Sequence, residues 1–273
     1  MKKFLSVLLA LGLAVSATAC AGGASSSSEA ASSEPEATPA AESEAATSEA
    51  AAATGEVMTY DEYMAAAVDE AVTIESCVQA KQSYYAEQGT ATVYLQDESG
   101  AYFAYDMACT QEEYDAMTEG TRIRVSGYKA EWSGEIEIMD GQLDEILEGD
   151  TYVAEPVDVT ELLGTDELES HQNQKVKFTG LTVAPSTIDG DTTEYAFLYN
   201  YDGSGTQGDD VYFNVEYNGE KYQFLVESYL CDSESEVYKA VEALEIGQTI
   251  DCEGFLYWYE GVNPHITSVT VAG

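Results

Sequence analysis

Aromatic side chains are the most abundant candidates for a binding surface in this sequence. The chain contains 20 tyrosines and 2 tryptophans. Tyr128 and Trp132 lie in one predicted β-hairpin, and Tyr257 and Trp258 lie in another. Aromatic rings at hairpin tips can stack on sugar rings or on nucleobases. The competing explanation for any single tyrosine is core packing, because alternation along a strand turns half of its side chains inward.

Acidic residues in two glycine-containing loops are the candidate metal ligands. Asp189 and Asp191 lie in one loop, and Asp209 and Asp210 lie in the other. Ca²⁺ binds several oxygen ligands from a flexible loop. Neither loop completes an EF-hand pattern, so solvated loop charge is the default interpretation. We therefore expect no cofactor, and Ca²⁺ is the one cation for which the loops provide suitable ligand types.

Residues suited to catalysis are sparse. The only histidines are His171 and His265, and the sequence has no HExxH, GxSxG or P-loop motif. Glu131, Glu135 and Glu137 lie close along one predicted hairpin and could supply a glycosidase-type pair, but such pairs arise by chance in a chain with 51 Asp and Glu residues. We expect a protein without catalytic activity. An exported hydrolase that uses carboxylates is an alternative.

The first 20 residues carry an export signal. Two lysines precede an apolar run, and small residues follow directly before Cys20. A cysteine in this position resembles the lipobox of bacterial lipoproteins, which implies cleavage after residue 19 and a lipid on Cys20. Residues 20–55 are rich in Ala, Ser and Glu without large apolar side chains, so we expect a disordered tether. The chain would then face outward from the cell membrane.

Four further cysteines follow this segment. An even number in an exported chain predicts two disulfides. Three pairings are open, and the repeat described below favours one bond in each domain, Cys77–Cys109 and Cys231–Cys252.

The charge balance restricts the classes of partner. The chain has 10 Lys and Arg residues and 51 Asp and Glu residues, which gives a formal net charge of −41. Phosphate backbones are bound mainly through Lys and Arg, so we expect no nucleic-acid partner. Proteins, glycans and cations remain open.

A repeated hairpin organises the folded part of the chain. The segments 120–138 and 247–262 share the same order of parts, with Gly120, Ile123, Gly127 and Gly134 each matched 127 positions later. Two copies of a closing hairpin imply two similar β-domains. In each copy, strands precede a short helix and the hairpin follows it, which is the order of an OB-fold barrel. Domain two has one additional predicted strand, at 195–199.

Domain one also carries the hairpin sequence YLQDESGAYFAY and the closing hairpin GYKAEWSGEIEI. On these two motifs the chain resembles a type of bacterial surface lipoprotein with tandem OB-like domains. The resemblance implies a fold and brings no catalytic residues.

These observations predict an all-β protein with short helices and two five- or six-stranded OB-like barrels, at 56–150 and at 151–273 with its connector. We expect a lipid-anchored binding or adaptor protein, attached to the membrane through Cys20, that engages an extracellular protein, a glycan or a cation. Oligonucleotide binding is the alternative that the fold alone suggests, and the charge disfavours it.

Overall fold

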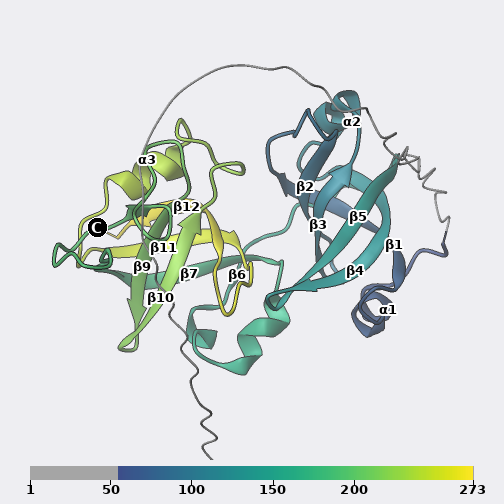
Figure 1. Ribbon diagram of the computed structural model, residues 1–273. Coiled ribbons are helices and arrows are strands. Elements are labelled where there is room, and N and C mark those ends of the chain that lie inside the picture. The colour runs from purple at the N-terminus through teal and green to yellow at the C-terminus, as the bar shows by residue number, and fades with distance from the viewer. Residues whose placement is uncertain (1–54, 273) are drawn as a thin grey trace, which may run out of the picture. The chain divides into compact units, whose positions relative to one another are not determined.

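The computed structural model describes residues 55–272, all of which belong to one compact unit (Figure 1). The predicted signal (1–19), the predicted lipidation site Cys20 and nearly all of the predicted tether (20–55) lie outside these residues. Within them, no helix combines the length and the apolar character that crossing a bilayer requires. The predicted fold class is confirmed, since two closed barrels account for most of the strands.

The first barrel closes in the order β1-β2-β3-β5-β4. Its closure depends on a parallel contact between β3 and β5, while its other neighbours are antiparallel. Helix α2 connects β3 to β4, as predicted, and its first residue follows the capping residue Thr110. The elements are α1 (Tyr60–Ala65), β1 (Ala71–Lys81), β2 (Thr90–Gln96), β3 (Ala101–Ala108), α2 (Gln111–Ala116), β4 (Arg122–Trp132) and β5 (Glu135–Ile146).

The second barrel repeats this order. Strands β7, β9, β10, β12 and β11 close through a β7–β9 pairing, and β10 runs parallel to β12. The short strands β6 and β8 add to its sheet, and two 3₁₀ turns form the connector. The elements are β6 (Val157–Asp158), η1 (Thr160–Leu162), η2 (Asp166–His171), β7 (Lys175–Ala184), β8 (Leu198–Tyr199), β9 (Val211–Tyr217), β10 (Glu220–Val226), α3 (Glu236–Glu242), β11 (Thr249–Phe255) and β12 (His265–Val271).

The repeated glycines Gly127 and Gly254 each occupy an irregularity in the closing hairpin, where the register shifts. A Cβ on Gly127 would lie 2.6 Å from Ile138 Cγ2, and one on Gly254 would collide with the backbone of His265. Both positions therefore require glycine for a close approach of the partner strand.

Each barrel has its own core, formed by the inward residues of its strands. Ile74, Val93 and Ile138 are fully buried in the first. Phe213 and Phe224 are fully buried in the second. The two barrels are built from separate stretches of the chain, blue to teal in the first and green to yellow in the second (Figure 1).

The prediction of two disulfides is wrong for the described chain, because all four of its cysteines are free. Cys77 pairs with Gln96 at the end of β2, whereas Cys109 follows the residue that pairs with Thr90 at its beginning. The two cysteines are therefore separated by most of the length of β2, about 20 Å at the usual rise per residue.

In the second barrel, Cys252 is buried on β11, and β12 separates that strand from β10. Cys231 lies in the segment between β10 and α3, outside the strands of the sheet. Both thiols are free.

Candidate ligand-binding site

The outer face of the β2–β3 hairpin is covered by the second barrel. Tyr94 stacks on Phe255 with ring centroids 4.3 Å apart, and its hydroxyl lies 2.8 Å from His265 Nδ1. Phe103 contacts Tyr257 edge-on at 5.5 Å. Every residue of β2 is buried, because the core of the first barrel covers one face and the second barrel covers the other. This hairpin is the usual ligand surface of an OB barrel. Here part of it forms the interface between the two barrels, called the joint below, in which Tyr94 and Phe103 contact Phe255, Tyr257 and His265.

Polar contacts extend the joint to the turn between β4 and β5. The side chain of Gln172 accepts a hydrogen bond from Ile136 N at 3.0 Å and donates one to Gly134 O at 2.8 Å. Glu135 Oε2 accepts one from Trp258 N at 2.8 Å. The connector, the hairpin tip of the first barrel and the β11–β12 loop of the second are therefore held by directional bonds.

Two buried carboxyl groups lie on β5 beside the joint. Burial raises the pKa of Glu135 to about 9 and that of Glu137 to about 7. Among the described residues, Glu135 Oε1 has no hydrogen-bond partner. Glu135 is therefore protonated at neutral pH, and the joint carries less negative charge than its sequence suggests.

Next to the joint is a cavity of about 640 Å³ whose walls come from both barrels. The first barrel contributes the outer face of β3 and the end of β4, and the second contributes the outer faces of β9 and β10. The volume lies within the usual range of ligand sites. Its solvent-accessible aromatic residues are Tyr105, Trp132, Tyr201, Tyr212, Tyr257 and Tyr259.

Several of these rings are unusually exposed. Trp132 is 60% exposed and Tyr201 is 69% exposed. Large apolar side chains that converge on a hollow without covering one another typically mark an interaction site.

The polar side chains of the cavity carry negative charge or none. Gln82, Gln223 and Asn263 provide amides, and Asp210 and Glu227 provide carboxyl groups. Burial raises the pKa of Glu227 to about 7 and lowers that of the lining residue His265 to about 3, so the imidazole is neutral. Among the described residues, the cavity lining contains no Lys or Arg.

The two carboxyl groups are held by hydrogen bonds from the segment that follows β10. Asp210 Oδ1 accepts hydrogen bonds from the backbone and the hydroxyl of Ser228, at 2.8 and 2.7 Å. Glu227 accepts from Tyr229 N and Leu230 N, at 3.1 and 2.8 Å. These bonds fix both groups as acceptors at the cavity wall.

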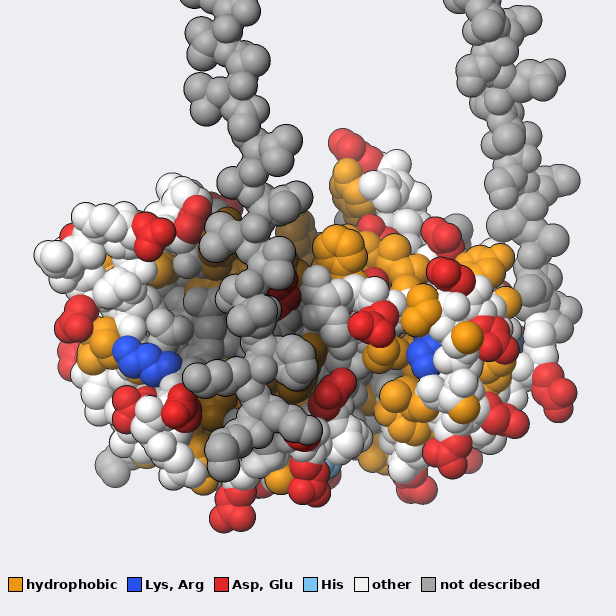
Figure 2. Space-filling view, turned by 60° about the horizontal axis from the view of Figure 1, so that its bottom comes forward, with side chains coloured by type: hydrophobic (Ala, Val, Ile, Leu, Met, Phe, Trp, Pro, Cys, Tyr) orange, Lys and Arg blue, Asp and Glu red, His pale blue; other side chains and the backbone are white. Residues whose placement is uncertain are grey.

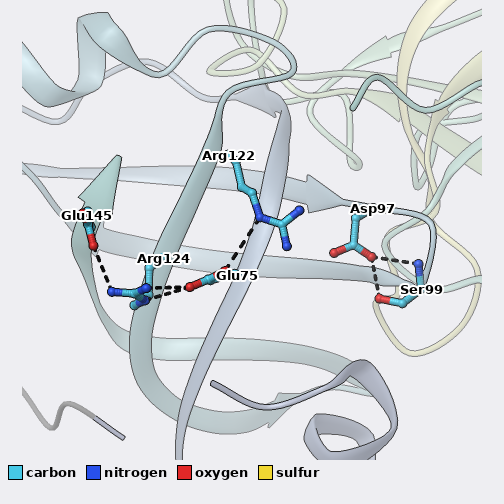
Figure 3. A network of polar contacts seen from close by, with 6 residues as sticks. All are labelled: Glu75, Asp97, Ser99, Arg122, Arg124 and Glu145. Atoms are coloured by element: carbon cyan, nitrogen blue, oxygen red, sulfur yellow. Dashed lines mark hydrogen bonds and ion pairs between the residues drawn. The ribbon is translucent and has the colours of Figure 1, made fainter. Parts of the chain in front are cut away.

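Most cations of the described chain are already engaged. Arg124 donates to Glu75 at 2.6 Å and to Glu145 at 2.9 Å, and Arg122 lies 3.8 Å from Glu75 (Figure 3). Lys129 is buried, and its ammonium donates to three backbone carbonyls at the end of α1.

Lys81 donates to a backbone carbonyl, and Lys175 and Lys239 pair with carboxylates. Only Lys177 and Lys221 are left without such a contact within residues 55–272. On the face seen in Figure 2, red carboxylate side chains are widely spread and blue basic ones are few.

The structure places two of the four predicted aromatic site residues, Trp132 and Tyr257, in the cavity lining. Tyr128 is 49% exposed on β4 and does not line the cavity. Trp258 packs against the hairpin tip, where a Cβ on Gly134 would lie 2.7 Å from its Cδ1. Trp258 is therefore a residue of the joint.

Sequence reasoning missed Tyr201 and Tyr212 as cavity residues. Alternation in β9 contained a signal for Tyr212, because its neighbours Val211 and Phe213 are both core residues and Tyr212 must point outward. Tyr201 lies in a loop, where no periodicity indicates the direction of a side chain.

The predicted metal ligands are not brought together. Within residues 55–272, no group of three or more His, Cys, Asp or Glu side chains is arranged to hold a metal ion. Asp191 accepts hydrogen bonds from Thr193 and Tyr195, and Asp209 accepts from Thr206. These carboxylates stabilise their own loops.

The sequence matches no protein-family model, and no curated protein is significantly similar to it. Among solved structures, it is similar to the Ifi202 HINa domain in complex with 20-bp double-stranded DNA, at 11% identity and a TM-score of 0.32, over 76% of this chain and 96% of that one. It is also similar to the p204 HINb domain, at 9% identity and a TM-score of 0.31, over 72% of this chain and 95% of that one.

A replication protein A heterotrimer bound to single-stranded DNA gives 12% identity and a TM-score of 0.29, over 74% of this chain and 49% of that one. At these values the likenesses are too distant to indicate a ligand.

Proposed function

We propose that this protein is a non-enzymatic binding protein whose ligand is a neutral glycan, bound in the cavity between the two barrels. One observation carries the proposal. Exposed aromatic rings of both barrels converge on a cavity whose other polar side chains are amides, carboxyl groups and the imidazole of His265. The apolar faces of sugar rings pack on aromatic rings, and sugar hydroxyls donate to carboxylates and exchange hydrogen bonds with amides.

The same cavity is poorly suited to an oligonucleotide. Its rings could stack on bases, but the phosphates would meet Asp210 and Glu227 in a lining that offers no Lys or Arg among the described residues. Phosphate contacts supply most of the affinity in such complexes. Charge therefore favours the glycan over the oligonucleotide that the OB fold suggests.

We also propose that the protein is exported and anchored through a lipid on Cys20, so that the barrels face outward. The support is the sequence of the first 20 residues. Expression of the full chain in a bacterium should give a membrane-bound protein with a lipid-modified N-terminal cysteine. Recovery of Cys20→Ser in the membrane fraction at the same level would contradict the anchor.

A titration of the full chain carrying Cys20→Ser tests the binding function. Cello-, malto- and xylo-oligosaccharides, single-stranded DNA, choline and Ca²⁺ are added separately, and heat is measured. We expect binding of an oligosaccharide, with about a 5- to 160-fold loss of affinity in Trp132→Ala, since one stacking contact contributes about 1–3 kcal/mol. Tyr128→Ala, an exposed aromatic outside the cavity, is the matched control and should bind normally.

Three results would contradict the proposal. Binding of DNA alone would support the oligonucleotide alternative, and binding of choline alone would identify an aromatic cage for a cation. Hydrolysis of the oligosaccharide, lost in Asp210→Asn or Glu227→Gln, would identify a hydrolase.

A further inference from the structure

A second cavity adjoins the first. It has a volume of about 510 Å³, and both barrels contribute to its lining. Three residues line both cavities: Gln82, Tyr105 and Glu227. Side chains can line two cavities only where these meet, so the shared residues mark a passage or a thin wall between them.

The second cavity has the same chemical character as the first. Tyr229 is 67% exposed and Tyr85 is 44% exposed, and both lie in its lining. Gln88 adds an amide, Asp106 adds a carboxylate, and Lys and Arg are again missing from the lining within the described residues. The pattern of aromatic faces, amides and carboxyl groups therefore continues along the surface.

The walls of the second cavity are tied together across the two barrels. Ser83, in the loop between β1 and β2, donates from its backbone and its hydroxyl to the carbonyl of Tyr229, at 2.8 and 3.1 Å. This contact uses only the backbone of Tyr229, so the ring is left free to face a ligand. It also fixes the two loops that must stay in register for one continuous groove.

We infer that the two cavities are neighbouring subsites of one groove, and that the ligand is an oligosaccharide chain long enough to occupy both. The inference rests on the proposed function and specifies its ligand. Tyr105 is central to it, because its ring is 42% exposed and borders both subsites. A chain of sugar units would cross the groove at Tyr105, with Trp132 and Tyr201 beside one part and Tyr85 and Tyr229 beside the other.

A chain-length series tests this inference. The mono-, di-, tri- and higher oligomers of each of the cello-, malto- and xylo- series are titrated into the full chain carrying Cys20→Ser and into its Tyr229→Ala, Trp132→Ala and Tyr128→Ala variants. We expect affinity to rise with chain length up to a limit, with one chain bound per protein. The longest oligomers should lose about tenfold in affinity in Tyr229→Ala, whereas the shortest should bind that variant as tightly as the parent.

Tyr229→Ala keeps the backbone carbonyl that binds Ser83, so the groove should remain folded, and an unchanged melting temperature checks this. Affinity independent of chain length would overturn the inference and leave the proposed function standing. Two short oligomers bound per protein, without tighter binding of longer ones, would show separate sites and also overturn it. No binding by any series would overturn both proposals.

Discussion

The second strands of the two barrels have the same place in the fold and opposite surroundings. Every residue of β2 is buried, whereas β9 alternates between buried core residues and partly or fully exposed ones. The difference arises on the outer face, where Tyr94 of β2 stacks on Phe255 and Tyr212 of β9 borders the cavity. One OB fold thus presents this strand face to the neighbouring barrel in one copy and to the cavity in the other.

The largest expected effect is a difference in the free energy of unfolding between variants of β2 and of β9. Tyr94→Ala removes a fully buried ring and its hydrogen bond to His265, so we expect it to lower the free energy of unfolding by about 3–5 kcal/mol. Tyr212→Ala removes a partly exposed ring and should cost far less. Urea denaturation of both variants measures the difference, and equal losses would show that the joint does not distinguish β2 from β9.

A smaller effect concerns the pH dependence of the joint. The pKa of Glu135 is raised by burial to about 9, from an ordinary value of 4.5. The folded state therefore keeps a proton that the unfolded chain releases, and the stability that this provides is lost as pH rises through 9. From pH 7 to 8.5 we expect stability to fall by up to about 1.4 kcal/mol per pH unit for this group.

The range from pH 7 to 8.5 avoids the titration of groups whose effect on stability has the opposite sign. His265, whose pKa is lowered to about 3, contributes stability that is lost as pH falls below 6.5, so its effect runs the other way at acidic pH. Glu137 and Tyr257 lie close enough to influence Glu135 electrostatically. Glu135→Gln should flatten the slope, and Glu131→Gln, an exposed neighbour in the same hairpin, should not. A slope unchanged in Glu135→Gln would show that another group titrates.

The smallest expected effect concerns the cysteines, in which the two barrels resemble each other. Each barrel has one buried and one half-buried thiol. A reductant should therefore leave the melting temperature unchanged, and a thiol reagent should modify Cys109 and Cys231 before Cys77 and Cys252. Mass spectrometry of alkylated peptides would check the order, and a lower melting temperature with reductant would show that a disulfide forms.

The fold was largely predictable from the sequence because its signals are local. The turn at Asn218 and Gly219, both with positive φ, and the cap at Thr110 follow from residue type alone. The limits of the local view are visible at 140–148, which lies beyond the predicted hairpin segment 120–138. Most of that segment continues β5, because Leu143 is buried and keeps the strand in the barrel.

The candidate site was only half predictable, for a different reason. Trp132 and Trp258 occupy similar places in the repeat, yet one borders the cavity and the other packs on the joint. What separates them is how the second barrel contacts the first, through residues such as Tyr94 and Phe255 that are far apart in sequence. The cysteine pairing failed likewise, since strand order and register decide which side chains meet.

Fluorescence of single-tryptophan proteins tests the central claim most directly, because the chain has 2 tryptophans, and Trp132 lines the cavity while Trp258 does not. In Trp258→Phe, the remaining Trp132 should change its emission when an oligosaccharide binds. In Trp132→Phe, the emission of Trp258 should stay constant, even where calorimetry detects residual binding. Oligosaccharide binding that leaves the emission of Trp132 unchanged, or that changes only the emission of Trp258, would contradict a glycan site between the barrels.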